Sequence, residues 1–473
     1  MNNQSIRLRF APSPTGYLHV GGLRTALYNY FYAKKFNGKL VLRIEDTDQN
    51  RLVKNAEQNL INMLSWAGID FDEGPHIGGE LGPYRQSDRL FIYQEYYHQL
   101  IKSNYAYPCF YSDERLNSLA TGELSTEDAA IEDAIFKDFD LNKIWDKMAN
   151  EKFVIRFKIP NNQILSHNDL IKGEVKFDLT LINDPIIIKS DGFPTYHFAN
   201  VIDDYLMNIT HVIRGEEWLP SIPKHILLYQ AFNWKVPEFG HLPLLLNSDK
   251  TKLSKRKNDV SVSNYIDKGY TKEALINFLS LLGWHEKGDR EIYKLDELIE
   301  SFSFERVSKS GAVFDINKLN YFNNYYIKNY PINELQILLN DFYNNKNIFN
   351  DKMIELVRDK INTLNDFKKS LEFFFVDSII FNEDDKNYIK SDLSNAILNI
   401  FSDELKKLND NQEIQLNPII KFIQNTIDCS PKDIWKTLRL ILTGQPHGPS
   451  LNDIVNIYGL NKAIDLVNLH VKK

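Results

Sequence analysis

The sequence predicts an α/β protein in which a parallel-sheet domain is interrupted by an inserted segment and is followed by an all-helical module. Three observations support this prediction. Strand and helix patterns alternate through the first hundred residues, the regular pattern lapses between residues 86 and 190, and no glycine occurs between Gly311 and Gly444. Because glycine disfavours helix interiors, a long glycine-free tract with apolar residues at helical spacing is typical of packed helices.

A strand–helix–strand pattern opens the chain. Apolar residues alternate with arginine between Ile6 and Phe10, which is the period of a strand. Apolar residues at helical spacing follow until Asn37, where an Asn-Gly pair ends the helix. The apolar run 40–44 then leads into Glu45, as expected for a buried parallel strand with polar residues at its carboxyl end. The pattern predicts one right-handed parallel unit of a nucleotide-binding sheet.

The less regular stretch includes an acidic segment, and sheet-like patterns return at 185–188, near its end, and at 212–214. A composition shift near residues 320–330 marks the start of the helical module. We therefore expect four regions: 1–85 with 191–246 as the sheet domain, 86–190 as the insertion, 247–325 as a region with a cationic loop, and 326–473 as the helical module.

Length, charge and cysteine content narrow the class of protein. At 473 residues the chain has room for about three domains. Its net charge of −7 argues against a simple polybasic nucleic-acid binder, although local basic patches remain compatible with it. Two cysteines, Cys109 and Cys429, are too few for a disulfide framework or a four-cysteine metal site, which fits a reducing cytoplasm. No apolar stretch approaches the roughly 18 residues of a membrane span, so we expect no membrane partner.

Two short motifs more than two hundred residues apart suggest a site for a triphosphate. His19 lies where the first strand turns into a helix, and backbone N–H groups at such a helix start favour an anion. The loop 250–257 carries five cationic residues in eight. No Gly-x-x-x-x-Gly-Lys-Ser/Thr loop occurs, so ATP would have to be held in another way. A histidine that caps a helix and a solvated run of charge are the plainer interpretations.

The chain resembles the bacterial glutamyl-tRNA synthetases, class I enzymes that join glutamate to its tRNA. The resemblance covers nearly the whole chain and is specific because seven motifs occur in the family's order. These motifs are Arg9–Gly16, His19–Gly22, Arg43–Asp48, Asp191–Asn200, Ile213–Trp218, Lys252–Arg256 and Leu442–Pro449.

The resemblance implies a Rossmann-like catalytic domain, an inserted domain that binds the tRNA acceptor end, a stem-contact region and an α-helical anticodon-binding module. It implies ATP-dependent ligation of L-glutamate to tRNA(Glu) through a glutamyl adenylate, with release of AMP and pyrophosphate. ATP with Mg²⁺ is then a substrate, and activation in this family generally needs tRNA. We expect a cytoplasmic monomer.

The resemblance also implies roles for individual residues. The expected catalytic residues are His19 and Lys255, with Lys255 as the main cation for the transition state. The expected ATP-binding residues are His19, Gly21, Gly22, Glu217, Lys252, Lys255 and Arg256. The expected glutamate-binding residues are Arg9, Ser13, Glu45, Tyr196, Asn200 and Arg214.

Glutamate brings two carboxylates and one ammonium, so its pocket needs buried cations and one anion. Arg9 and Arg214 would hold the carboxylates, and the sequence does not say which arginine takes which group. Glu45, helped by Ser13, would receive the ammonium. An ion pair between Arg9 and Glu45 is the alternative. Glu216 and Glu217 could contact the nucleotide. An acidic first turn of a helix explains them almost as well.

One departure from the family and several alternatives remain. Some members carry zinc in the insertion, but Cys109-Phe110-Tyr111 keeps a single cysteine, so we expect no structural zinc. A non-discriminating enzyme that also charges tRNA(Gln), a glutaminyl-tRNA synthetase, a short tRNA-modifying paralogue and a non-catalytic RNA-binding descendant are the other candidates. Pro12-Ser13-Pro14, the long helical C-terminus, and the presence of both His19 and Lys255 argue against the last three in turn.

Overall fold

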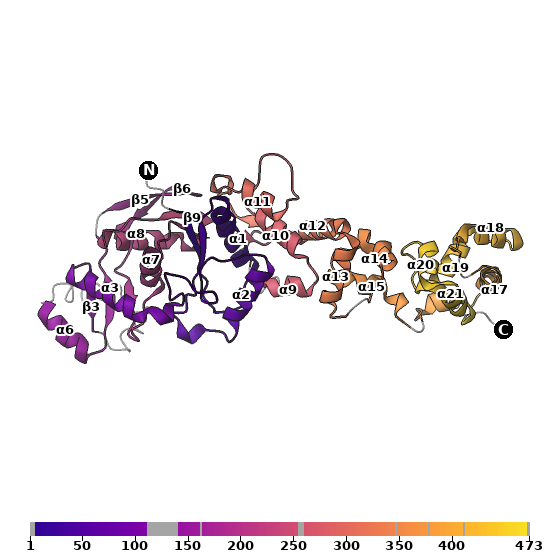
Figure 1. Ribbon diagram of the computed structural model, residues 1–473, viewed down its shortest axis with the longest axis horizontal. Coiled ribbons are helices and arrows are strands. Elements are labelled where there is room, and N and C mark those ends of the chain that lie inside the picture. Colours follow the sequence, from indigo (N-terminus) through magenta and orange to yellow (C-terminus); the bar gives the residue numbers. More distant parts are fainter. Residues whose placement is uncertain are drawn as a thin grey trace. The chain divides into compact units, whose positions relative to one another are not determined.

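The computed structural model describes residues 5–110, 141–160, 163–253, 260–345, 348–376, 379–409 and 412–470. The chain divides into two compact units. The first comprises residues 1–266 and 275–316, and the second comprises residues 267–274 and 317–473 (Figure 1). Among the described residues, none of the helices is long and apolar enough to cross a membrane.

A four-stranded parallel sheet forms the centre of the first unit. Its strand order is β2 (Lys39–Leu42), β1 (Arg7–Phe10), β8 (His211–Gly215) and β9 (Glu238–Leu242). The predicted strand–helix–strand unit is confirmed, because α1 (Val20–Lys35) connects the parallel neighbours β1 and β2. The carboxyl ends of all four strands therefore meet at one edge, where ligands of open parallel sheets bind.

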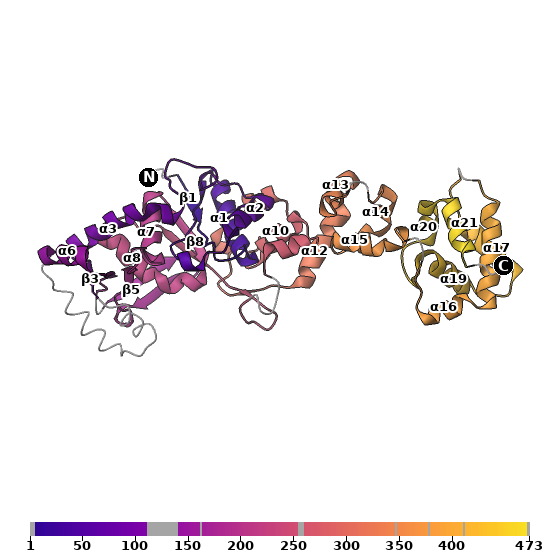
Figure 2. The ribbon, with the colours of Figure 1, turned by 90° about the horizontal axis from the view of Figure 1, so that it is seen from below.

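Helices cover both faces of this sheet. Helix α1 packs on β1, β2 and β8. Helices α7 (Tyr196–Leu206), α8 (Ile222–Ala231) and α3 (Leu90–Lys102) share one apolar core with sheet residues such as Val212 and Phe239, and Figure 2 shows α7 and α8 from a second side. The remaining helices of this unit are α2 (Ala56–Trp66), α6 (Leu141–Asn150), α9 (Val262–Asp267) and α11 (Leu295–Ser301), and α10 (Lys272–Leu281) contributes residues to both units.

The insertion carries its own strands. β3 (Ala106–Cys109), β4 (Val154–Phe157) and β7 (Ile186–Ile188) form a three-stranded antiparallel sheet. β5 (Ile164–Asp169) and β6 (Gly173–Asp178) form a hairpin. The sheet-like pattern at 185–188 thus belongs to the insertion rather than to the parallel sheet. Most of the acidic part of the insertion lies outside the described residues.

The apolar run before the cationic loop does not extend the parallel sheet. β9 ends at Leu242, and the following β10 (Leu245–Leu246) pairs instead with β11 (Ala312–Val313). From the apolar segment 242–246, the sequence predicts that the loop follows a strand at the ligand-binding edge of the main sheet. The structure corrects this, because the strand before the loop belongs to a small separate sheet.

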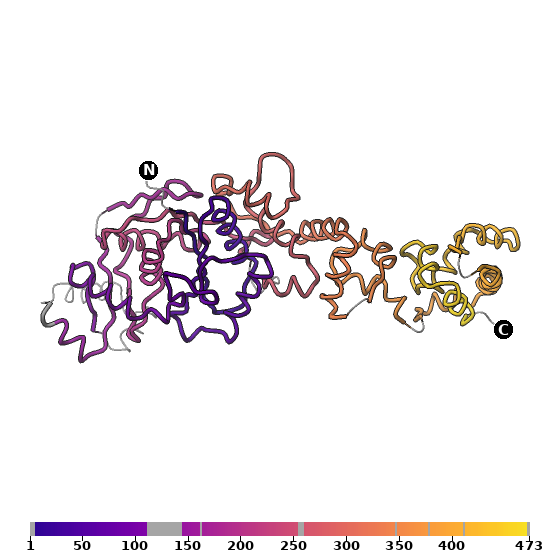
Figure 3. Tube along the Cα trace, viewed as in Figure 1, coloured from indigo at the N-terminus to yellow at the C-terminus, as the bar shows by residue number. Residues whose placement is uncertain are grey.

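The second unit contains only helices among its described residues, and Figure 3 traces it as successive coils from orange to yellow. Ile, Leu, Val and Phe side chains from Ile327 to Val467 form its core. Gly444 ends α19 in the left-handed conformation (φ 71°), which explains why glycine reappears there. The helices are α12 (Ile316–Asn329), α13 (Ile332–Phe342), α14 (Asp351–Val357), α15 (Asn365–Ser370), α16 (Glu383–Ile389), α17 (Asp392–Lys406), α18 (Leu416–Thr426), α19 (Pro431–Thr443), α20 (Leu451–Tyr458) and α21 (Leu460–Asn468).

Candidate active site

His19 is the N-cap of α1. Its Nδ1 accepts a hydrogen bond from the backbone N–H of Gly22 at 3.0 Å. An Nδ1 that accepts carries no proton, so the neutral ring bears its proton on Nε2. The capping bond thus selects the tautomer that presents an N–H donor, and capping and anion binding are compatible roles for this imidazole.

Two glycines make room for this arrangement. A β-carbon at Gly21 would lie 3.1 Å from Nδ1 of His19, and one at Gly22 would lie 3.0 Å from Cδ1 of Leu18. Gly21 therefore allows the imidazole to fold back over the first helical turn, and Gly22 leaves room for the Leu18 side chain.

The described residues on either side of the cationic loop lie at this same helix start. Before the loop, the Leu253 N–H donates to the Leu245 carbonyl at 2.9 Å, and Leu245 approaches Gly21. After the loop, the Val20 N–H donates to the Val260 carbonyl at 2.8 Å, and His19 pairs with Ser261 in a β-bridge. Lys255 and Arg256 themselves lie outside the described residues.

Exchanging His19 for asparagine should separate its two roles. Asparagine is a good N-cap and can keep the bond to Gly22, but it lacks the Nε2–H donor. We expect His19→Asn to keep the thermal stability and to lower amino-acid activation by roughly 10²-fold, the cost of one preorganised donor. His19→Ala should in addition lose about 1 kcal/mol of stability. Thermal unfolding and pyrophosphate exchange measure the two effects, and full activity of His19→Asn would contradict the assignment.

The two remaining expected nucleotide contacts lie in exposed positions. Lys252 is exposed, and its carbonyl accepts from the Asn247 side chain at 3.2 Å. Glu217 is exposed and lies against Gly215, where any β-carbon would collide with its carboxylate. Glu216 has a structural role instead, because it pairs with Lys172 and accepts from the Leu244 N–H at 2.9 Å.

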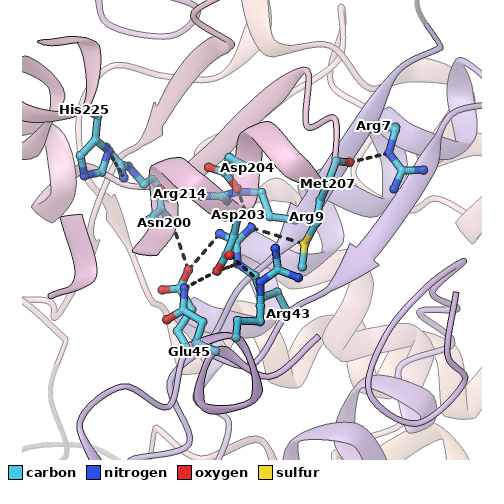
Figure 4. A network of polar contacts seen from close by, with 12 residues as sticks. Arg7, Arg9, Arg43, Glu45, Asn200, Asp203, Asp204, Met207, Arg214 and His225 are labelled. Carbon is cyan, nitrogen blue, oxygen red and sulfur yellow. Dashed lines mark hydrogen bonds and ion pairs between the residues drawn. The ribbon is translucent and has the colours of Figure 1, made fainter. Parts of the chain in front are cut away.

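A buried network of charges lies at the carboxyl ends of the strands (Figure 4). Arg9 donates to Asp204 at 3.0 Å, and Arg43 donates to the same carboxylate oxygen at 2.7 Å. Arg43 also donates to Glu45 at 3.0 Å, and Asn200 donates to that Glu45 oxygen at 3.0 Å. The alternative of a direct Arg9–Glu45 pair is wrong: both residues are described, and Arg9 pairs with Asp204 while Glu45 pairs with Arg43.

Burial and the neighbouring guanidinium groups shift the pKa values of Glu45 and Asp204 in opposite directions. Burial raises the pKa of Glu45, and the nearby guanidinium groups of Arg43 and Arg9 limit the rise. Burial also acts to raise the pKa of Asp204, but Arg43 and Arg9 outweigh it and hold that pKa below its ordinary value. Asp204 is therefore the ionised partner that allows two buried arginines to lie side by side.

Asp204→Asn should destabilise the first unit strongly. It leaves Arg9 and Arg43 without their shared anion, and removing one partner of a buried pair costs about 3–5 kcal/mol. Because the pKa of Asp204 is lowered by folding, its contribution is present above the pKa of an unfolded aspartate and is lost as the pH falls through the lower folded value. Denaturant unfolding at several pH values measures this. Glu174→Gln, which breaks an exposed pair with Lys176, is the control and should change little.

Arg214 lies beside this network and is 5% exposed. Its Nε donates to His241 Nε2 at 3.1 Å, and its Nη1 donates to the Tyr196 hydroxyl at 2.8 Å and to His225 Nδ1 at 3.3 Å. Burial and the Arg214 charge hold the pKa of His225 well below its ordinary value, so His225 stays neutral and can accept. All these partners are neutral, and no described carboxylate forms an ion pair with Arg214.

The expected glutamate-binding residues are brought together by three elements. Arg9 and Arg214 end neighbouring strands, and Tyr196 and Asn200 lie one turn apart on α7. Ser13 is exposed in the loop after β1, where the Pro12 carbonyl accepts from the Glu45 N–H at 3.0 Å. The ring centre of Trp218 lies 4.2 Å from the ring centre of Tyr196.

Sequence reasoning missed Arg43, Asp203 and Asp204. Asp203 is fully buried and accepts from Arg89 at 2.7 Å and from Tyr93 at 2.8 Å. A signal was present, since two adjacent acids occur in an otherwise apolar stretch of α7. Buried acids of this kind need cationic partners.

Among the described residues, no three His, Cys, Asp or Glu side chains are grouped so as to hold a metal ion. Cys109 is buried in β3, and Tyr111, the next position of the family's zinc motif, lies outside the described residues.

From the sequence, four residues near the carboxyl end are candidates for facing RNA, with a core tryptophan and solvated charges as the alternative: Trp435, Lys436, Arg439 and His447. Lys436 lies 3.8 Å from the ring centre of Tyr388, and Arg439 donates to the Pro449 carbonyl at 2.7 Å. Trp435 packs against the core of the second unit. His447 is exposed. Trp435 therefore contributes to the core, whereas Lys436 and Arg439 have intramolecular partners.

The fold and the site together define a class I tRNA synthetase. A family model described as "tRNA synthetases class I (E and Q), catalytic domain" matches residues 5–321, and one described as "Anticodon binding domain" matches residues 331–465. The glutamate–tRNA ligase of Finegoldia magna is 41% identical over 98% of both chains, and that of Chlorobaculum parvum is 43% identical over 97% of this chain and 96% of the relative.

Solved structures agree with this. A glutamate tRNA ligase from Elizabethkingia meningosepticum, crystallised with its amino acid, superposes with a TM-score of 0.88 at 34% identity, covering 98% of this chain and 99% of that one. The synthetase from Elizabethkingia anophelis gives a TM-score of 0.85 over 99% of this chain and 100% of that one, also at 34% identity. The chain belongs to the glutamate–tRNA ligase family.

Proposed function

We propose that this protein ligates L-glutamate to tRNA(Glu) in two steps. The glutamate α-carboxylate first attacks the α-phosphorus of ATP, which forms glutamyl adenylate and releases pyrophosphate. The terminal ribose hydroxyl of the tRNA then attacks the adenylate carbonyl and releases AMP. The observation that carries the proposal is Arg214, a buried guanidinium whose partners are all neutral, because a buried cation of this kind is completed by an anionic ligand.

The neighbouring residues fit the rest of glutamate. Glu45 is a buried carboxylate suited to an ammonium group. Asn200 donates its N–H to Glu45, and its Oδ1 is buried without a partner among the described residues, so it offers a second acceptor to the same ammonium. Arg9 is already neutralised in part by Asp204, whereas Arg214 is not. We therefore assign the side-chain carboxylate of glutamate to Arg214, with Tyr196 beside it, and place Arg9 and Ser13 near the α-carboxylate and ammonium end.

We propose that ATP binds at the start of α1. His19 donates from Nε2 to the α-phosphate, and Gly21 and Gly22 keep the backbone there accessible. Lys252, Lys255 and Arg256 supply cations to the triphosphate, and Glu217 lies toward the nucleoside. The loop that carries Lys255 and Arg256 begins and ends at described residues next to His19. Magnesium enters with ATP as part of the substrate, since Mg²⁺ is commonly held by phosphates and water.

Three regions are proposed to bind tRNA. The insertion, residues 86–190, would hold the acceptor end near the adenylate, with 247–325 on the stem. The helical module, residues 326–473, would read the anticodon, which agrees with the family description of residues 331–465. Because the chain is acidic, binding should depend on local basic patches and weaken with salt.

Glutamate-dependent ATP–pyrophosphate exchange, run with and without tRNA(Glu), tests the proposal. We expect exchange only when glutamate, ATP and tRNA are all present. Equal exchange with glutamine, or no exchange in the complete mixture, would overturn the assignment.

A further inference from the structure

Arg214 is connected to the insertion by a chain of buried hydrogen bonds. His241, on β9, accepts from Arg214 Nε at 3.1 Å through Nε2, and its Nδ1 lies 2.6 Å from Oδ2 of Asp169. Asp169 is the last residue of β5 and therefore belongs to the hairpin rather than to the parallel sheet. The side chains of both His241 and Asp169 are fully buried.

The two ends of this chain require the same tautomer of His241. An ionised carboxylate only accepts, so Nδ1 of His241 must carry the proton. A guanidinium only donates, so Nε2 of His241 must be unprotonated to accept from Arg214. Burial holds the pKa of His241 below its ordinary value even beside Asp169, which keeps the ring neutral and both bonds intact.

Asp169 is itself held by the backbone. Its Oδ1 accepts from the backbone N–H groups of Ile171 at 3.0 Å, Lys172 at 2.9 Å and His241 at 3.2 Å. This leaves Oδ2 for the imidazole alone. The hairpin turn thus fixes the carboxylate, the carboxylate fixes the imidazole, and the imidazole fixes the plane of the guanidinium.

We infer that Asp169, acting through His241, is a positioning residue that orients Arg214 for the side-chain carboxylate of glutamate. The inference rests on the proposed function, in which Arg214 binds that carboxylate. Selection of glutamate over glutamine then depends on a residue of the inserted hairpin that does not touch the amino acid.

Asp169→Asn replaces Oδ2, the oxygen that contacts His241, by an amide nitrogen. The asparagine Oδ1 can still accept from the three backbone N–H groups, so the turn is preserved. Its amide N–H₂ now donates to His241 Nδ1, so the ring proton must move to Nε2. The Nε2–H of His241 then faces the Nε–H of Arg214, and two donors cannot form a hydrogen bond. Replacing an orienting aspartate by asparagine acts in this way, by imposing the wrong tautomer on an intact geometry.

Steady-state aminoacylation of tRNA(Glu) tests the inference. We expect Asp169→Asn to raise the KM for glutamate by about 10- to 100-fold, the range typical of residues that orient a binding group, and to narrow the preference for glutamate over glutamine. The KM for ATP and the melting temperature should stay near those of the unmodified protein. Asp178→Asn, which removes an exposed carboxylate at the other end of the hairpin, is the matched control and should leave all four quantities unchanged.

A pair of substitutions at His241 gives an independent test. Glutamine can place an acceptor where Nε2 lies, whereas alanine cannot. We expect His241→Gln to retain more of the glutamate preference than His241→Ala. The inference is overturned if Asp169→Asn keeps the original KM and preference, if the KM for ATP rises in step with that for glutamate, or if the two His241 variants are equally impaired. Failure of the unmodified protein to charge glutamate would instead refute the proposed function.

Discussion

Replacing Lys255 with alanine should lower the rate of glutamate activation by about 10²- to 10³-fold, which is the usual cost of removing one preorganised charge from a transition state. Negative charge grows on the phosphoryl oxygens and on pyrophosphate as the α-phosphorus is attacked, and a cation in the loop beside His19 would stabilise it. Single-turnover formation of the adenylate in the presence of tRNA measures this directly.

The control for Lys255 is Lys250→Asn. It removes one exposed cation from the same run, and asparagine tolerates the positive φ of 63° that this position adopts. We expect near-normal activation for this control. If both variants lose activity equally, then the loop acts through its total charge; if Lys255→Ala stays fully active, the assignment of Lys255 is wrong.

Arg214→Gln should have the second large effect. It removes the buried guanidinium while keeping a polar side chain, and truncating one partner of a buried charge pair costs about 2–5 kcal/mol. At about 1.4 kcal/mol per factor of ten, kcat/KM for glutamate should fall by roughly 30- to 4,000-fold, while that for glutamine should fall much less. The ratio of the two kcat/KM values is the quantity to measure.

Arg7→Gln is the matched control for Arg214. Arg7 is also buried on the parallel sheet, but it pairs with Glu73 near the start of β1, away from the carboxyl ends of the strands. We expect its loss to lower stability without altering the glutamate-to-glutamine ratio. An unchanged ratio in Arg214→Gln would contradict the role proposed for that residue.

The family resemblance assigned Arg9, Glu45 and Arg214 to the glutamate pocket. Local patterns added that all three lie near the carboxyl ends of parallel strands, which meet at one edge of the sheet. Tyr196 and Asn200 came from the resemblance too, and their spacing of four places them on one face of α7. The intramolecular hydrogen-bond and ion-pair partners of these residues were not predictable in the same way, because they depend on packing between distant elements.

His241 and Asp169 illustrate that limit. They lie 72 residues apart in the chain, and no spacing rule connects an edge strand of the sheet to a hairpin of the insertion. The same reason explains β10, whose two residues have the composition of a sheet strand but pair with 312–313 instead. His19 was ambiguous for a different reason, because a helix cap and a phosphate donor need the same position at a helix start.

One charging assay tests the central claim most directly. Purified protein, ATP, tRNA(Glu) and labelled glutamate are incubated together, and the label that precipitates with the RNA is counted, with tRNA(Gln) and labelled glutamine in parallel. We expect glutamate to appear on tRNA(Glu) in an ATP-dependent manner and glutamine not to appear on either RNA. The account is contradicted if a folded protein attaches no glutamate to RNA, or attaches glutamine equally well. Either result would mean that Arg214 does not bind an acidic side chain beside an ATP bound at His19.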